Sequence, residues 1–183
     1  VSGVLIAYLA MNNIAKNATE KTKHTPIGFT VSLEGRALRL LSGREYSRAE
    51  LVKKLKPFEA SPGELDKALD ELQAKDFINE QRVVDSVLHR RSAKLGTARI
   101  KQELQSKGLD AGAVLDAVDL LKSTELERAR EVWRKKFGTP TQSSPADAKE
   151  SAKERAKQIR FLLSRGFGAE VIHKVVASAG EDD

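Results

Sequence analysis

Cysteine is absent from this chain of 183 residues, and only 5% of its residues are aromatic. The lack of cysteine excludes disulfides, thiolate metal sites and cysteine catalysis, and it is compatible with a reducing compartment. The low aromatic content argues against a large β-sandwich or barrel. The apolar run Val4–Met11 is too short to span a bilayer, which needs about 20 residues, and it lacks the flanking features of a signal peptide. We therefore expect a cytoplasmic protein with no membrane partner.

Motifs typical of enzymes are missing as well. The histidines His24, His89 and His173 lie far apart and do not have the spacing of metal ligands. The glycines are scattered near predicted helix ends and form no phosphate-binding loop, and no serine lies in a nucleophile elbow. Carboxylates fall beside lysines and arginines, as they do on solvated helix surfaces. We expect a protein that is not an enzyme and that uses no cofactor or metal.

Positive charge exceeds negative charge in this sequence. There are 32 lysines and arginines against 26 acidic residues, which gives a net charge of +6, and the estimated pI is 9.5. Such a balance favours a polyanionic partner: nucleic acid, an acidic protein surface, or a protein already bound to nucleic acid.

An internal repeat is the most informative feature that the sequence does contain. The three copies have identical offsets between their small or apolar positions. They are Ala49, Leu51, Leu55, Leu65, Ala68, Leu69 and Leu72; then Ala98, Ile100, Leu104, Val114, Ala117, Val118 and Leu121; then Ala156, Gln158, Leu162, Ile172, Val175, Val176 and Ala179. A fixed register of this kind predicts one helical unit used three times, each copy burying its apolar face against its neighbours.

Each unit is predicted to contain three helices, separated by capping residues, glycine and proline. The predicted N-caps are Ser47, Ser61, Thr97, Asp110 and Thr124, with Glu50, Glu64 and Glu127 completing capping boxes. A short hairpin wing is the one alternative to helix, formed by Phe77 and Ile78 with Gln81–Val84.

The predicted fold is therefore all-α, with three tandem three-helix repeats forming an elongated array. The repeats are expected over residues 33–78, 79–123 and 124–179, with a linker at 139–146 inside the third repeat and an acidic tail at 180–183. Residues 1–32 lack the periodicity of the rest. They are either a disordered tail or an extension produced by a misplaced gene start, in which case the native chain begins at Val31.

Basic residues concentrate in the second and third repeats, whereas the helix around Leu65–Leu72 is acidic. The candidate partner-binding residues are Arg90, Arg91, Lys94, Arg99, Lys101, Arg134, Lys135, Lys136, Arg155, Lys157, Arg160 and Arg165. Arg91 is distinctive because it interrupts an apolar stripe at helical spacing. It is either an anchor for a partner at a seam between units, or an arginine that snorkels to solvent or binds helix-terminal carbonyls of the next unit.

The segment from Ala37 to Leu51 closely resembles the opening block of the RecX family of bacterial RecA regulators. Further blocks resemble the family in the same order: Ala98 to Leu109, Glu127 to Arg130, Lys135 to Gly138, Arg155 to Lys157, and Phe161 to Phe167. The resemblance covers about residues 33 to 178 and includes blocks from all three units. Lys56–Glu59 departs from it, because many relatives have a basic residue and glycine at that corner.

The resemblance implies a curved array of three-helix repeats that binds RecA and the RecA–DNA filament. Such a protein would act as a monomer in DNA repair and the SOS response. It would inhibit recombination, ATP hydrolysis and coprotease activity by capping the filament or occupying its groove. The resemblance thus agrees with the polyanionic partner that the charge predicts.

Two alternatives remain at the level of the sequence. A winged-helix DNA-binding protein has the same order of helices, but its recognition helix would be the acidic one, which repels phosphates. A general single-strand binder needs exposed aromatic residues for stacking, and most aromatic residues here lie on apolar stripes. Weak DNA binding through the basic units is expected to fall steeply with salt.

Overall fold

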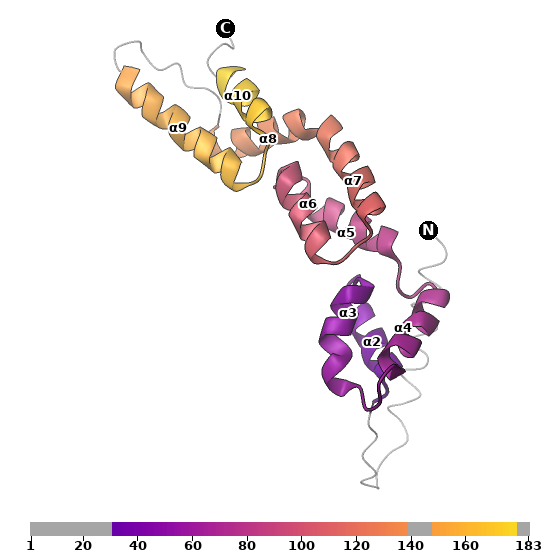
Figure 1. The fold of residues 1–183 in the computed structure, drawn as a ribbon. Helices are drawn as coiled ribbons and strands as arrows, with labels where there is room; N and C mark the ends of the chain where they lie inside the picture. Colours follow the sequence, from indigo (N-terminus) through magenta and orange to yellow (C-terminus); the bar gives the residue numbers. More distant parts are fainter. Residues whose placement is uncertain (1–30, 139–147, 179–183) are drawn as a thin grey trace, which may run out of the picture. The chain divides into compact units, whose positions relative to one another are not determined.

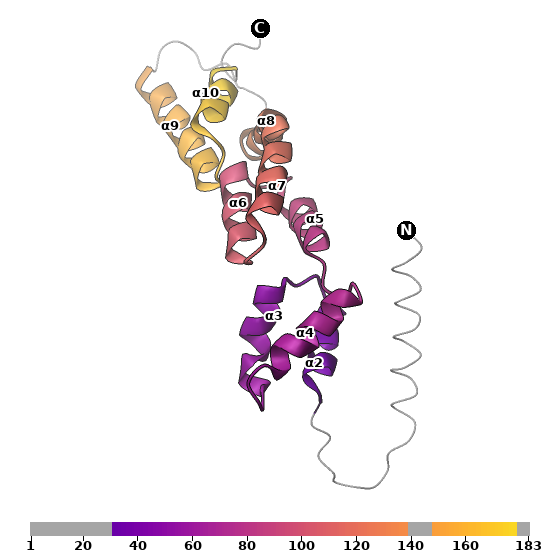
Figure 2. The same ribbon diagram turned by 45° about the vertical axis from the view of Figure 1, so that its right-hand side comes forward.

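The computed structural model of the protein describes residues 31–138 and 148–178, and within these ranges it contains helices and no strand. The first three-helix group consists of α2 (Leu33–Leu41), α3 (Arg48–Leu55) and α4 (Glu64–Ala74), with a 3-10 turn at Lys56–Phe58. The second group consists of α5 (Glu80–Arg91), α6 (Thr97–Ser106) and α7 (Ala111–Ser123). The third group consists of α8 (Glu125–Phe137), α9 (Ala148–Ser164) and α10 (Ala169–Ser178). These groups are labelled in Figures 1 and 2 and confirm the all-α repeat fold. No helix in the described ranges is long and apolar enough to cross a bilayer.

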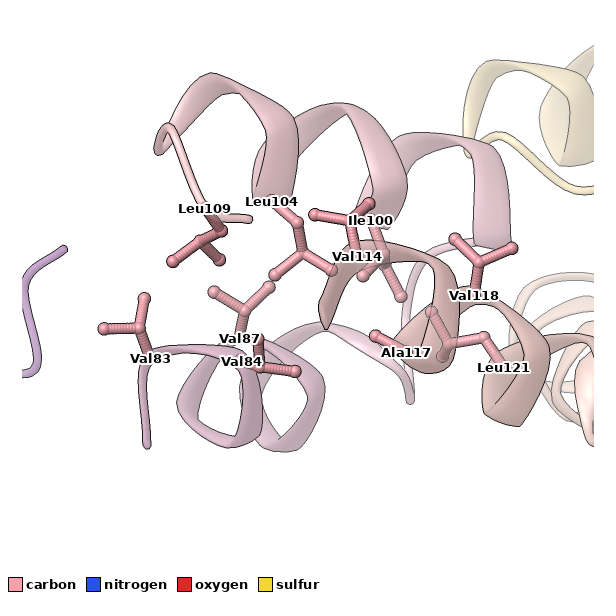
Figure 3. Close-up of a cluster of buried hydrophobic side chains, with 10 residues drawn as sticks. All are labelled: Val83, Val84, Val87, Ile100, Leu104, Leu109, Val114, Ala117, Val118 and Leu121. Carbon is pink, nitrogen blue, oxygen red and sulfur yellow. The ribbon is translucent and has the colours of Figure 1, made fainter. Parts of the chain in front are cut away.

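Each group of three helices encloses its own cluster of buried apolar side chains. In the second repeat, Val84 and Val87 of α5 face Ile100 and Leu104 of α6, and Val118 comes from α7 (Figure 3). The apolar residues recur one helical turn apart, so every helix presents a single stripe to this core. Burial of these stripes stabilises each three-helix group around its own core.

The third copy of the repeat has a polar residue, Gln158, where the first two have the buried residues Leu51 and Ile100. Its Oε1 accepts a hydrogen bond from the indole Nε1–H of Trp133 at 3.1 Å. Trp133 is buried, so its N–H needs a partner inside the repeat. Gln158 therefore departs from the apolar pattern because it accepts the hydrogen bond of the buried Trp133.

Two of the predicted N-caps are confirmed. Ser47 accepts from the amide of Glu50, whose carboxylate accepts from the amide of Ser47, which completes the capping box of α3. Asp110 accepts from the amides of Gly112 and Ala113 at the start of α7.

The capping boxes predicted at Ser61 and Thr124 are wrong. Before α4, the cap position is held by Gly63 in a left-handed conformation, and the amides of Gly63 and Leu65 donate instead to Glu59. The 3-10 turn that follows α3 brings this carboxylate back to the helix start. At Thr124, α7 ends where α8 begins, and the hydroxyl donates to the carbonyl of Leu121 rather than capping α8.

The hairpin wing is also wrong, because Gln81–Val84 form the first turns of α5. Asn79 caps this helix by accepting from the amide of Arg82, and Val83 and Val84 are buried in its core. The winged-helix alternative therefore lacks its wing, because the residues expected to form the hairpin are helical. The predictions for residues 1–30, the linker at 139–146, Ala179 and the tail at 180–183 fall outside the described residues.

Candidate partner-binding surface

The first and second repeats meet where the start of α3 contacts the end of α6, and we call this contact the first seam. The Ser47 hydroxyl donates to the carbonyl of Lys107, and the Lys107 ammonium lies 2.9 Å from a carboxylate oxygen of Glu50. A Cβ on Gly108, next along the chain, would lie 2.7 Å from that of Ala49. The two repeats are therefore joined by a short, closely packed contact that includes an ion pair.

The carboxylate of Glu50 serves two cations at the first seam. Glu50 also binds the guanidinium of Arg44 at 3.0 Å, and the Lys107 side chain is only 10% exposed. Burial alone would raise the pKa of Glu50, but the hydrogen bonds from Lys107, Arg44 and the Ser47 amide outweigh burial and lower that pKa. The carboxylate therefore stays ionised and holds Lys107 inside the seam.

The second and third repeats meet in the equivalent way, and we call this contact the second seam. At the start of α6, the amide of Gly96 donates to the carbonyl of Arg165 at 2.9 Å, and the amide of Ala98 donates to Gly166 at 3.1 Å. A Cβ on Gly96 would lie 2.3 Å from backbone atoms of Gly166 and Phe167. Glycine is thus required here by close backbone approach.

Arg128 of α8 also joins the third repeat to the second, through hydrogen bonds to backbone carbonyls. Its guanidinium donates to the carbonyls of Ser92, Leu95 and Leu121 at 3.0, 2.7 and 2.9 Å. Burial lowers the pKa of Arg128, and the nearby Glu125 carboxylate opposes that shift. These bonds satisfy carbonyls in the last turn of α7, at the cap of α5 and in the loop before α6.

Glu125, at the start of α8, completes this contact. It is buried and accepts a hydrogen bond from the amide of Thr97 at 3.0 Å. The predicted side-chain cap at Thr97 is therefore wrong: Gly96 is the cap residue, and Glu125 from the next repeat supplies the acceptor. Sequence reasoning missed Glu125 and Arg128 as seam residues, although Arg128 lies within the block Glu127–Arg130 that carries the family resemblance.

Among the described contacts, Arg91 does not bind helix-terminal carbonyls of the next unit, and its role as an anchor for a partner stays a prediction. Its Nε lies 3.0 Å from a carboxylate oxygen of Glu103, which joins α5 to α6 inside the second repeat, and its side chain remains 47% exposed. The exposed head on a partly apolar helix face fits the snorkelling arginine among the alternatives. The binding of backbone carbonyls across repeats belongs to Arg128 instead.

Most of the candidate basic residues project to solvent. The exposed ones are Arg90, Arg91, Lys94, Arg99, Arg134, Lys135, Lys136, Arg155, Lys157 and Arg160, whereas Lys101 and Arg165 are half-buried. Within the described residues, no group of acidic and histidine side chains is arranged to hold a metal ion.

The structure brings some of these residues together. Arg99 lies against the end of α9, where its Nε is 3.4 Å from the carbonyl of Ser164, next to Arg165. The guanidinium of Arg165 stacks on Phe161 at 3.9 Å, and that ring meets Phe137 of α8 edge-on, with centroids 5.2 Å apart. The basic end of α8 therefore adjoins α9. No described contact joins Arg90 or Lys94 to this group, so the twelve residues do not form one contiguous site by contact.

Comparison with known proteins identifies the family. The chain matches the family models described as RecX, first three-helix domain, over residues 35–72, and RecX, third three-helix domain, over residues 123–176. It is 51% identical to the regulatory protein RecX of Leptothrix cholodnii, covering 83% of this chain and 92% of the relative, and 41% identical to that of Ralstonia pickettii, covering 82% and 90%. The crystal structure of RecX from Lactobacillus salivarius shares the fold, with a TM-score of 0.63 at 21% identity over 80% of this chain and 94% of that one. The chain therefore belongs to the RecX family of regulatory proteins.

Proposed function

We propose that this protein binds RecA and the RecA–DNA filament and inhibits strand exchange, ATP hydrolysis and coprotease activity without catalysing a reaction itself. Membership of a family of regulatory proteins supports the regulatory role. The observation that carries the proposal is the set of exposed basic side chains on the second and third repeats. A filament formed on DNA is strongly anionic, so these side chains would draw the protein to it.

The function is tested by the DNA-dependent ATPase of RecA. Protein added at a substoichiometric ratio to a filament assembled on single-stranded DNA should slow ATP hydrolysis at moderate salt. An ATPase rate that stays the same as without the protein would contradict the proposal.

The basic surface is tested with charge-reversed variants. Changing Arg134, Lys135, Lys136, Arg155 and Lys157 to glutamate should weaken filament binding while the circular dichroism spectrum keeps its helical signal. The matched control reverses five exposed basic residues elsewhere: Arg39, Lys53, Lys54, Lys67 and Lys122. Equal inhibition by the two variants would exclude the basic surface as the binding site but leave the family assignment untouched.

Weak binding to DNA alone is a second proposed activity, since the same exposed side chains attract phosphates. The logarithm of the affinity should fall linearly with the logarithm of salt concentration, because bound cations release counterions from the DNA. The acidic outer surface of α4, with Glu64, Asp66, Asp70 and Glu71 exposed, argues against that helix as the DNA reader.

A further inference from the structure

The two seams occupy corresponding positions of the repeat but differ in their charged residues. Glu50 follows Ala49 of the first copy, and Arg99 follows Ala98 of the second at the same place. Lys107 and Arg165 likewise both precede the glycine that closes a seam. Where the first seam holds a glutamate facing a lysine, the second seam therefore holds two arginines.

Within the part of the chain that the structure describes, neither arginine is paired with an acidic side chain, whereas Lys107 binds Glu50 directly. Two acidic residues of these helices have other partners: Glu103 pairs with Arg91, and Glu125 accepts from the amide of Thr97. The first turn of α6 contributes no acidic residue of its own.

Both guanidiniums are held in place with hydrogen-bond donors to spare. Arg99 uses its Nε on the carbonyl of Ser164, which leaves its two terminal nitrogens without a described hydrogen bond. Arg165 places its guanidinium over the ring of Phe161, and within the described residues its side-chain nitrogens form no hydrogen bond. Planar N–H pairs of this kind match the two oxygens of a carboxylate.

We infer that Arg99 and Arg165 form a docking site for an aspartate or glutamate side chain of the protein partner, which takes the place that Glu50 holds at the first seam. This inference rests on the proposed function for the identity of the partner. The segment of the partner that binds at the second seam is therefore expected to be acidic.

A carboxylate suits this site better than a phosphate. Phosphates at a helix start are bound largely through free backbone N–H groups, but the amides of Gly96, Thr97 and Ala98 are already donated to Arg165, Glu125 and Gly166. A singly charged carboxylate needs only the two guanidiniums.

The variant Arg99→Glu tests the site because it places a glutamate opposite Arg165, as Glu50 lies opposite Lys107 at the first seam. The new glutamate would pair with Arg165, so the site would be filled from within the chain. Its melting temperature should not fall below that of the wild type, while its affinity for the RecA filament on single-stranded DNA should fall about tenfold, the loss expected for one charge-assisted contact. Lys53→Glu changes the net charge equally at an exposed position of the first repeat and is the matched control.

A peptide probe separates this inference from the proposed function. A fluorescent peptide of consecutive glutamates should bind the wild type and Lys53→Glu alike, and Arg99→Glu about tenfold more weakly. This result would support the site even if no RecA binding were found. If the wild type binds the filament but Arg99→Glu binds both filament and peptide as well as the control does, the inference is wrong and the proposed function stands.

Bare single-stranded DNA provides the remaining comparison. Arg99→Glu and Lys53→Glu should bind it with affinities within about twofold of each other, because their net charges are equal. A loss on bare DNA as large as the loss on filament and peptide would assign the site to phosphate and overturn the inference. If Arg99→Glu fails to fold, Arg99→Gln replaces it and Lys53→Gln becomes the control of equal net charge, with the same expected order of affinities.

Discussion

Glu50 is the residue on which the first seam depends most directly. One of its oxygens accepts from the Ser47 amide at 3.1 Å, while the other binds Arg44 and Lys107. The same carboxylate therefore caps α3 and holds the next repeat. Because Lys107 is almost fully enclosed, removing this partner leaves a buried ammonium without a counter-charge.

Replacing Glu50 by glutamine should therefore destabilise the protein at neutral pH, by about 2 kcal/mol in the free energy of unfolding. The pKa of Glu50 is lower in the folded than in the unfolded chain, so the stabilisation by its charge is complete above the unfolded pKa. It is lost as the pH falls through the folded pKa. Urea unfolding at a series of pH values should show the difference between wild type and Glu50→Gln shrinking in acid.

The control for Glu50 is an exposed glutamate with no structural task. Glu71→Gln on the outer surface of α4 removes the same charge from solvent, and surface substitutions of this kind change stability by about 0.5 kcal/mol or less. A difference between wild type and Glu50→Gln that stayed constant from neutral to strongly acid pH would show that the ionised carboxylate is not what stabilises the seam.

At the scale of single elements, the start of α4 depends on Glu59 and not on the serine that precedes it. Glu59 accepts from the amides of Gly63 and Leu65 and is held by the ammonium of Lys56. The pKa of Glu59 is lowered by these bonds, that of Lys56 foremost, with burial opposing. The carboxylate remains ionised and acts as the N-terminal cap of the helix.

Glu59→Gln should consequently lower the melting temperature, whereas Ser61→Ala should leave it nearly unchanged. The helix loses a charged cap in the first case and nothing with a described bond in the second. Thermal unfolding followed at the helical circular dichroism band gives both values. If Ser61→Ala lowered the melting temperature more than Glu59→Gln, Ser61 would be the cap of α4, as the local sequence suggests.

Local spacing explains which parts of the fold were predictable. The stripes through Leu51, Ile100 and Leu162 follow from helical periodicity alone, and all three residues are fully buried. Caps formed within three residues, as at Ser47 and Asp110, were predictable for the same reason. Caps supplied from a distance were not, because the sequence around a helix start does not indicate which chain segment will fold against it.

At the scale of the whole molecule, the same limit applies to the charged surface. Composition identified the basic residues of the second and third repeats but could not assign their partners. Arg91 and Arg128 illustrate this: both are arginines on amphipathic helices, yet one pairs with Glu103 and the other binds three backbone carbonyls of the second repeat. Their roles depend on which helix ends meet across repeats, and the repeat register alone did not show that the contacts occur between helix ends.

Gly96→Ala tests whether the second seam is closed by backbone contact. The added methyl group would overlap backbone atoms of Gly166 and Phe167, which cannot move away as a flexible side chain would. The seam should open, with loss of the hydrogen bonds from the Gly96 and Ala98 amides and a destabilisation of about 2–4 kcal/mol. Hydrogen exchange at Ala98 should quicken, whereas Gly43→Ala, whose Cβ would lie at an ordinary 3.5 Å from the Leu40 carbonyl, should be tolerated.

The same substitution also separates charge from geometry in the proposed carboxylate site. Gly96→Ala leaves every charged residue in place, but an open seam no longer holds Arg99 against the end of α9 beside Arg165. A site that depends on the two guanidiniums acting together should lose affinity for the glutamate peptide, because the arrangement that favours binding is no longer preformed. General attraction to a basic protein would survive the change. Fluorescence anisotropy with the peptide, at matched salt, decides between them: unchanged affinity in a variant with accelerated exchange at Ala98 would mean that the net charge, and not the seam, recruits acidic partners.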